Sequence, residues 1–205
     1  KVTLPYSKKK FGVPKNLYIL GTMNTADKSI ALLDSALRRR FSFTEMLPNS
    51  EVVGQMITID GIDVKLLFET INSRIEFLID KDHTVGHSYF LKIKDNQTVE
   101  GLALIFKNEI IPLLTEYFYG DFEKIQLVLG DNKDWKSKSD NKFFSIKPSQ
   151  QKALFGKEEA VEGYDEKIIF QLNDALLGSN EDGSINGKSE DLIKLFKSVY
   201  TKKSN

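Results

Sequence analysis

The clearest hydrophobic pattern in the chain lies in its middle third and predicts helices. Apolar residues recur at i, i+3, i+4 and i+7 from position 64 onward, which predicts an amphipathic helix over residues 63–79. The pattern returns over residues 100–118, where Pro112 is expected to kink the helix or split it in two. Asp121 is placed to cap a shorter helix that ends at Gly130. The apolar positions of the first two helices are Val64, Leu67, Phe68, Ile71, Ile75 and Leu78, then Leu102, Ile105, Phe106, Ile110 and Leu113.

The residues before position 50 follow a different pattern, that of short strands and turns. Two prolines and a glycine interrupt residues 1–15, which we interpret as a loop. Residues 16–23 are apolar on both faces, which predicts a short buried strand of the parallel-sheet type. One or two helical turns are predicted over residues 29–40. Residues 41–44 alternate like a strand, and the Pro-Asn-Ser sequence at 48–50 ends it.

Beyond Gly130 the pattern is less regular. Residues 131–142 are polar and predict a loop, and residues 143–146 predict a strand. We predict a helix over residues 165–177 and a flexible turn over 178–187. Ser189 is expected to cap a final helix. The apolar face of that helix comprises Leu192, Leu195, Phe196 and Val199.

The composition is that of an ordinary globular protein. The chain has 205 residues, of which 40% are hydrophobic and 28% charged. It contains no apolar run long enough to span a membrane. The absence of cysteine excludes disulfides and thiol catalysis and fits a cytoplasmic protein. With His83 and His87 as its two histidines, the chain is not expected to hold a metal site.

The net charge of zero hides an uneven distribution. Residues 1–40 hold nine lysines and arginines against two aspartates, a net charge of +7, so the remainder carries −7. A basic segment of this kind presents a face to phosphate groups, or it is a solvated lysine-rich loop. The composition leaves both interpretations open.

Three polar residues, Asn24, Thr25 and Asp27, follow directly on the predicted buried strand. An asparagine amide both donates and accepts, so Asn24 is suited to orient a water and contact a phosphate together. Thr25 adds a hydroxyl, and the Asp27 carboxylate is suited to hold a cation or an arginine from a partner. The alternative is that these residues satisfy a turn and cap the next helix.

Three adjacent arginines, Arg38, Arg39 and Arg40, follow within sixteen residues. On a helix they point in different directions, so at least one is expected to reach out of its domain. An arginine that enters a neighbouring subunit's nucleotide site stabilises the charge of the phosphoryl-transfer transition state. Such an arginine changes the rate by about 10³-fold or more.

The stretch from Leu20 to Phe43 resembles McrB-type AAA+ proteins, which are the GTP-using motor subunits of modification-dependent restriction systems. It begins with Leu-Gly-Thr-Met-Asn-Thr-Ala-Asp and ends with Ala-Leu-Arg-Arg-Arg-Phe-Ser-Phe. The resemblance continues through residues 85–90 (Val-Gly-His-Ser-Tyr-Phe), 111–118 and 127–131. It is specific over residues 13–131. Over the rest of the chain it is loose and rests on the Phe-x-x-Val-Tyr of the final helix.

The resemblance implies catalytic roles for three residues. Asn24 matches the sensor-1 asparagine that lines up the attacking water. Arg39 and Arg40 match the arginines at the subunit boundary, one of which acts in trans as an arginine finger. Arg38 is assigned with them to the nucleotide or subunit interface.

The resemblance also implies interface roles. Thr25 and Asp27 belong to the sensor-1 motif, with Asp27 facing a neighbouring subunit or the partner nuclease. Lys28 stands where the family has arginine, so it keeps the charge but loses the planar fork. The segment around His87 and Ser88 falls where related lids carry sensor 2, although the usual arginine is absent. Either His87 or Ser88 contacts the nucleotide, or His87 is a packing histidine.

The implied fold is α/β plus all-α. It comprises the end of an AAA+ α/β core over 1–49, a helical lid over 50–131, and a mixed extension over 132–205 to which we assign no role. The phosphate loop and the acidic Walker B strand of such an NTPase are absent from the sequence. We therefore expect a C-terminal fragment that is inactive alone.

The resemblance implies GTP or ATP with Mg²⁺ as cofactors, bound mainly by residues upstream of the fragment. The implied partners are further copies in a homo-oligomeric ring, an McrC-like nuclease subunit, and DNA through the full complex. The implied function is 5-methylcytosine-dependent restriction. Two alternatives stay open: an ATP-dependent remodelling protein of the MoxR or dynein-related type, and a non-catalytic nucleic-acid-binding module.

Overall fold

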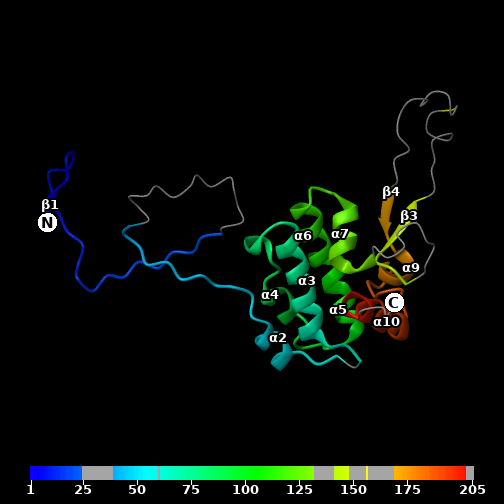
Figure 1. Cartoon of the computed structure of the whole chain (residues 1–205). Helices are drawn as coiled ribbons and strands as arrows, with labels where there is room; N and C mark the ends of the chain where they lie inside the picture. The colour runs from blue at the N-terminus through cyan, green and yellow to red at the C-terminus, as the bar shows by residue number, and fades with distance from the viewer. Residues whose placement is uncertain (25–38, 60, 132–140, 148–155, 157–168, 202–205) are drawn as a thin grey trace. The chain divides into compact units, whose positions relative to one another are not determined.

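The computed structural model describes residues 1–24, 39–59, 61–131, 141–147, 156 and 169–201 (Figure 1). The chain divides into two compact units, Lys1–Ser42 and Phe43–Asn205. The first unit contains a short hairpin. The second contains all the helices that the structure describes.

The hairpin of the first unit pairs β1 (Val2–Thr3) with β2 (Lys10–Phe11) in antiparallel register. The sequence predicts a loop here, and the observed strands are two residues each. The turn between them brings the chain back sharply, with Lys8 in the left-handed region at φ 56°. Hydrogen bonds from Leu4 N to Lys9 O and from Lys8 N to Leu4 O close it.

The two strands predicted around the polar motif are wrong. Residues 17–24 form no strand, and Tyr18 and Leu20 are 91% and 96% exposed. Residues 41–44 form no strand either. An apolar strand becomes stable when neighbouring strands form hydrogen bonds with its backbone N–H and C=O groups and when helices cover its two faces. Among the described residues, no strand pairs with either segment. Most of the helical turn predicted over 29–40 lies outside the described residues.

The second unit is built around the helix predicted over residues 63–79, and this prediction is confirmed. Helix α3 spans Val64–Leu78, and the Asp63 side chain caps it by accepting from Leu66 N over 2.9 Å. Its apolar stripe is buried. Helix α2 (Ser50–Met56), capped by Asn49, packs against α3, and α4 (His87–Leu91) packs against α2.

The break predicted at Pro112 is confirmed, and it takes an unexpected form. Helix α5 (Val99–Ile105) continues through a π-turn, η2 (Phe106–Ile110), into α6 (Ile111–Tyr117). Proline lacks the N–H that would bond four residues back, and its ring crowds that carbonyl. The turn before it widens, and Ile111 N donates to Phe106 O, five residues earlier.

Helix α7 (Phe122–Leu129) begins and ends as the sequence predicts. Asp121 caps it through Lys124 N, and Gly130 ends it at φ 82°. The Arg74 guanidinium joins this end to the end of the last helix, donating to Val128 O at 2.8 Å and to Val199 O at 2.7 Å. The positive φ at Gly130 favours glycine, and a Cβ there would meet Arg74 Nη1 at 3.3 Å, so the guanidinium would have to shift slightly.

The C-terminal region departs from the predictions in two places. The predicted strand is confirmed as β3 (Phe144–Lys147), but its antiparallel partner β4 (Ile169–Leu172) lies where a helix is predicted. Exposure alternates along β4, the pattern of a strand with one covered face. Helix α9 (Asp174–Leu177) is a single turn.

The cap predicted for the final helix is also wrong, although its apolar face is confirmed. Helix α10 spans Ser189–Tyr200, so Ser189 is its first residue and Lys188 precedes it without a side-chain cap. The Ser189 hydroxyl donates to Glu100 on α5 instead. The helix is therefore joined by a side-chain contact to the middle of the chain.

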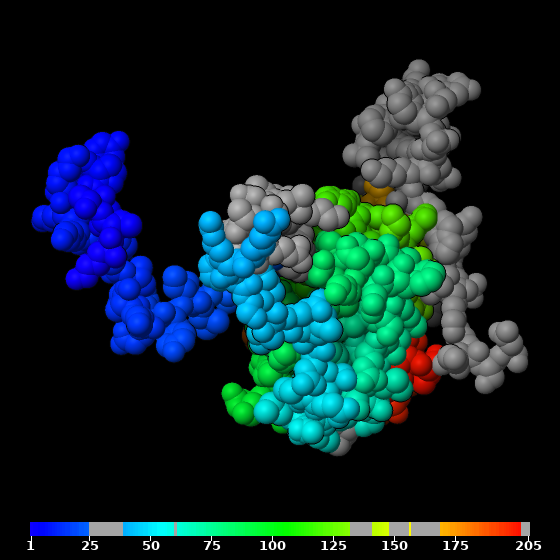
Figure 2. Space-filling model, turned by 60° about the vertical axis from the view of Figure 1, so that its left-hand side comes forward, coloured from blue at the N-terminus to red at the C-terminus, as the bar shows by residue number. Residues whose placement is uncertain are grey.

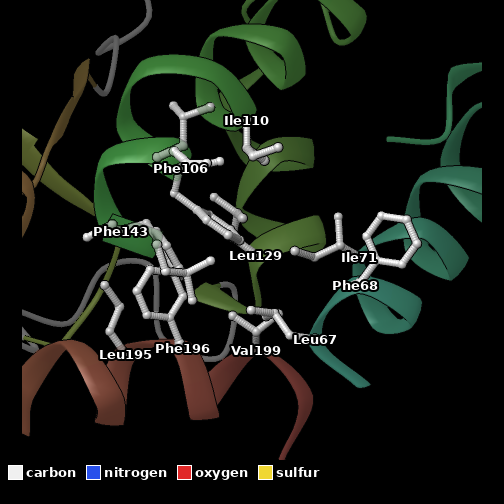
Figure 3. Packing of buried hydrophobic residues seen from close by; sticks show 14 of the residues in the cluster. Leu67, Phe68, Ile71, Phe106, Ile110, Leu129, Phe143, Leu195, Phe196 and Val199 are labelled. Carbon is white, nitrogen blue, oxygen red and sulfur yellow. The ribbon is translucent and has the colours of Figure 1, made fainter. Parts of the chain in front are cut away.

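The C-terminal elements share one hydrophobic core with the central helices. Phe106 of the π-turn lies at its centre, with ring centroids 4.9 Å from Phe196, 5.8 Å from Phe143 and 6.0 Å from Phe90. Figure 3 shows Phe143, the residue before β3, and side chains of α10 packed beside Phe106 and α3. The described part of residues 132–205 therefore completes the core of the helical unit.

A buried carboxylate joins the end of α7 to β3. Asp131 is 4% exposed and accepts from the backbone N–H groups of Phe143 and Phe144, the latter over 3.1 Å. Burial raises its pKa from 3.8 to about 7, against the opposing effect of these donors and of Lys142. Asn173 completes the junction by donating to Lys142 O.

We expect the Asp131 carboxyl to make stability depend on pH. Between pH 4 and 7 the folded state holds the proton that the unfolded state has lost, so the free energy of unfolding falls as pH rises, by about 3 kcal/mol. Asp131→Asn should flatten this slope in urea unfolding at several pH values. Asp182→Asn is the control, because the donors of Ser184 lower the pKa of that exposed carboxyl. An unchanged slope in Asp131→Asn would contradict the assignment.

Candidate functional site

The structure describes three of the residues predicted around the sensor-1 motif. Asn24 is exposed at the end of the segment that follows the hairpin, and Arg39 and Arg40 are exposed in a turn. Thr25, Asp27, Lys28 and Arg38 lie outside the described residues. The roles of all seven residues remain predictions.

The lid segment that carries His87 and Ser88 is held from α3. The Asn72 side chain bonds both backbone groups of Val85, accepting from its N–H at 2.7 Å and donating to its carbonyl at 3.0 Å. This pair of bonds reproduces the pairing that a strand neighbour would give. Gly86 is the N-cap of α4, and His87 and Ser88 are the first two residues of that helix.

The turn before this segment, η1 (Lys81–His83), is fixed by one carboxylate. Asp80 Oδ1 accepts from the backbone N–H groups of Asp82 and His83, and it lies 2.6 Å from His83 Nδ1. The contact with His83 lowers the pKa of Asp80. The His83 ring packs edge-on against Tyr117 of α6, at 5.0 Å between centroids, and burial raises the pKa of Tyr117.

His87 and Ser88 have different surroundings. His87 is half-buried, and its Nδ1 accepts a hydrogen bond from the backbone N–H of Asn49 over 3.2 Å. A ring nitrogen that accepts carries no proton, so the neutral imidazole carries it on Nε2. Ser88 is exposed. The two candidates for a nucleotide contact are therefore not equivalent.

Two hollows lie among the described residues of the second unit. Hollows of about 250 and 390 Å³ lie beside α5 and between α2 and α3, and neither is lined by His87 or Ser88. The described residues contain no group of three histidines, aspartates or glutamates that could hold a metal ion. In the same part of the chain no helix is long and apolar enough to cross a membrane.

Sequence reasoning missed Asn72 and Asp80, which organise this region. Asn72 lies inside a strongly apolar helix, where a short polar side chain that competes for backbone bonds is unfavourable unless it has a partner. That position was a usable signal. Its partner, thirteen residues away, was not visible without the fold. Asp80 follows α3, and its carboxylate accepts hydrogen bonds from the N–H groups two and three residues later. This is a typical capping position.

Two comparisons with known proteins bear on this chain. Residues 63–126 match the family described as "McrB, alpha-helical lid domain". The chain is also 34% identical, over 154 residues, to the type IV methyl-directed restriction enzyme EcoKMcrB subunit of Escherichia coli strain K12. That alignment covers 64% of this chain and 33% of the relative, so the chain spans about a third of the relative's length.

The matched range begins at Asp63, the cap of α3, and ends within α7. It therefore contains Asn72, with its two hydrogen bonds to Val85, and the segment with His87 and Ser88. The recognised segment is therefore the helical part of the second unit. Together the two matches support an McrB-type chain, in which residues 63–126 match the family's alpha-helical lid.

Proposed function

We propose that this chain is part of an AAA+ motor subunit that hydrolyses GTP or ATP in an McrBC-like, 5-methylcytosine-dependent restriction system. The observation that carries the proposal is the joint match to the McrB lid and to a restriction-enzyme McrB subunit. The full-length subunit would form a homo-oligomeric ring, engage an McrC-like nuclease, and reach DNA through the whole complex. The lid match favours this function over a MoxR-type or dynein-related remodelling protein.

Within that subunit, Asn24 would orient the attacking water in its own nucleotide site. Arg39 or Arg40 would enter the site of the next subunit, where a guanidinium is suited to phosphate oxygens. Thr25, Asp27, Lys28 and Arg38 would serve the same interface. These residues supply amide, hydroxyl and guanidinium groups to a nucleotide.

The phosphates and Mg²⁺ require further residues. Magnesium in nucleotide sites is held by carboxylates together with substrate phosphates. The phosphate loop and the acidic Walker B strand that supply such contacts in NTPases are absent from this sequence. The proposal therefore places the phosphate and Mg²⁺ contacts on residues outside this sequence. Of the two lid candidates, the exposed Ser88 fits a nucleotide contact better than His87, whose Nδ1 is already bonded to Asn49.

The test is nucleotide hydrolysis by the full-length protein that the proposal implies, with and without its nuclease partner. We expect hydrolysis in the parental protein and its loss in variants of Asn24 and of the two arginines. A parental protein that binds and hydrolyses neither GTP nor ATP would refute the proposal.

A second candidate function rests on the N-terminal hairpin. Its lysines are exposed, and the acidic residues of the first unit all come after position 26. Tyr6, at its turn, is also exposed. Exposed lysines on a hairpin can contact the phosphates of a nucleic acid. Such contacts give an affinity that depends on salt and not on sequence.

For this second function we expect duplex DNA to bind with an affinity that falls steeply with salt, as measured by filter binding. Replacing Lys8, Lys9 and Lys10 by glutamine should lower the slope of log affinity against log salt by about 3, close to one per lost phosphate contact. The control is glutamine at Lys188, Lys194 and Lys197, the same charge change on and beside α10. Equal slopes in both variants would exclude the hairpin as the binding surface.

A further inference from the structure

The chain enters the helical unit through an extended segment, residues 43–49, which we term the strap. It contains no helix or strand, and Met46 is 90% exposed. In Figure 2 the light-blue and cyan residues that lead directly into α2 lie on the visible face of the second unit. Along the chain, the strap follows the unit that carries Asn24, Arg39 and Arg40.

Two contacts fasten the strap to the lid. The Asn49 N–H donates to His87 Nδ1 over 3.2 Å, and Glu45 forms a 2.5 Å ion pair with Lys81. Asn49 also caps α2, accepting from Glu51 N and Val52 N. His87 therefore bonds the residue that caps α2, the first helix of the second unit.

The two side chains that contact the strap, Lys81 and His87, belong to the segment 80–87, and this segment is held by two other helices. Asn72 of α3 holds the backbone of Val85, and His83 packs against Tyr117 of α6. A displacement of the strap therefore acts on a segment that is coupled to the centre of the lid. The Glu45–Lys81 pair is exposed and contributes little by itself. The His87 side chain is half-buried, and its bond to Asn49 lies in an exposed position.

We propose that His87 is a positioning residue that fastens the strap to the lid through Nδ1, and so couples the lid to the nucleotide site. The proposal rests on the proposed NTPase function for its consequence but not for its geometry. It assigns His87 a partner in the strap, Asn49, instead of the nucleotide. The active atom is Nδ1, and the Nε2 proton is not required.

Two substitutions separate the ring nitrogens. Asparagine at position 87 places an acceptor near the position of Nδ1, whereas glutamine places its polar group near Nε2. The first measurement is amide hydrogen exchange of Asn49 in this 205-residue chain by NMR, which needs no nucleotide. We expect about tenfold loss of protection in His87→Ala and His87→Gln, and at most twofold loss in His87→Asn, since one hydrogen bond changes the equilibrium by this order.

The second measurement is hydrolysis by the full-length protein, with kcat and KM determined separately. We expect kcat to fall about tenfold in His87→Gln with KM nearly unchanged, and His87→Asn to restore it. A residue that contacts the nucleotide through Nε2 gives the opposite order, and that result would overturn the proposal. Equal Asn49 protection in all variants would also overturn it, as would altered protection with unaltered kcat.

The two hypotheses fail in distinguishable ways. If the parental protein hydrolyses no nucleotide, the proposed function is wrong, and the exchange data still decide whether His87 fastens the strap. A thermal melt of each variant, followed by far-ultraviolet circular dichroism, serves as the folding control. Lys81→Met, which breaks the exposed ion pair, should change the Asn49 protection by less than twofold.

Discussion

Replacing Arg39 and Arg40 together by alanine in the full-length protein will lower kcat for nucleotide hydrolysis about 10³-fold, with KM changed little. An arginine finger acts on charge that develops in the transition state, so its loss reduces kcat more than ground-state binding. Lysine at both positions should restore little activity, because it keeps the charge without the planar fork. Lys15→Gln, an exposed cation in the same unit, is the control.

The same variants test whether the two groups serve different subunits. Asn24→Ala subunits retain their arginines, and arginine-variant subunits retain Asn24. In a mixed ring, some interfaces combine an intact Asn24 with an intact arginine pair from the neighbour. We expect these interfaces to restore part of the activity that both pure variants lack. Mixed rings that form but stay inactive at every ratio would show that Asn24 and the arginines act in one subunit.

The second large effect concerns stability. Phe106→Ala and Phe196→Ala should each lower the free energy of unfolding by about 3–5 kcal/mol in urea denaturation, because each removes a fully buried ring. Phe106 contacts Phe90, Phe143 and Phe196, so its cavity opens at the meeting point of the helical and C-terminal elements. Phe77→Ala is the matched control, since that ring is 89% exposed.

This measurement also tests how the chain is organised. If the region after position 131 were an independent extension, Phe196→Ala would leave the unfolding of the central helices unchanged. We expect one cooperative transition that shifts as a whole, because α10 closes the same core as α3. A separate early transition would instead show that the C-terminal elements unfold alone.

The confirmed helix over 63–79 and the two wrong strand predictions before position 50 have one physical cause. The helix over 63–79 and the stop at Gly130 are specified by residues three or four positions apart, which the sequence displays directly. A strand depends on partners elsewhere in the chain. Residues 16–23 have no such partner among the described residues, and residues 169–172 acquire one in β3. The local hydrophobic pattern predicted neither the absence of a strand at 16–23 nor the presence of β4 at 169–172.

The candidate site was predictable to a similar extent. Residue identity singled out Asn24, Arg39 and Arg40, and the structure describes all three without testing their roles. His87 was identified as a candidate, but its Asn49 partner lies 38 positions earlier in the chain. Asn72 and Asp80 were missed for a related reason. Each bonds backbone groups, and the sequence does not show which backbone group a side chain will reach.

The bonds of Arg74 have a consequence for protein synthesis. Its guanidinium requires the carbonyl of Val199, 125 positions later, as well as that of Val128. At about 5–20 residues per second, roughly 4–14 seconds separate the translation of these two acceptors. During that interval the nascent lid exposes the apolar surface that α10 later covers. A newly made chain is therefore vulnerable to aggregation or proteolysis until α10 leaves the ribosome.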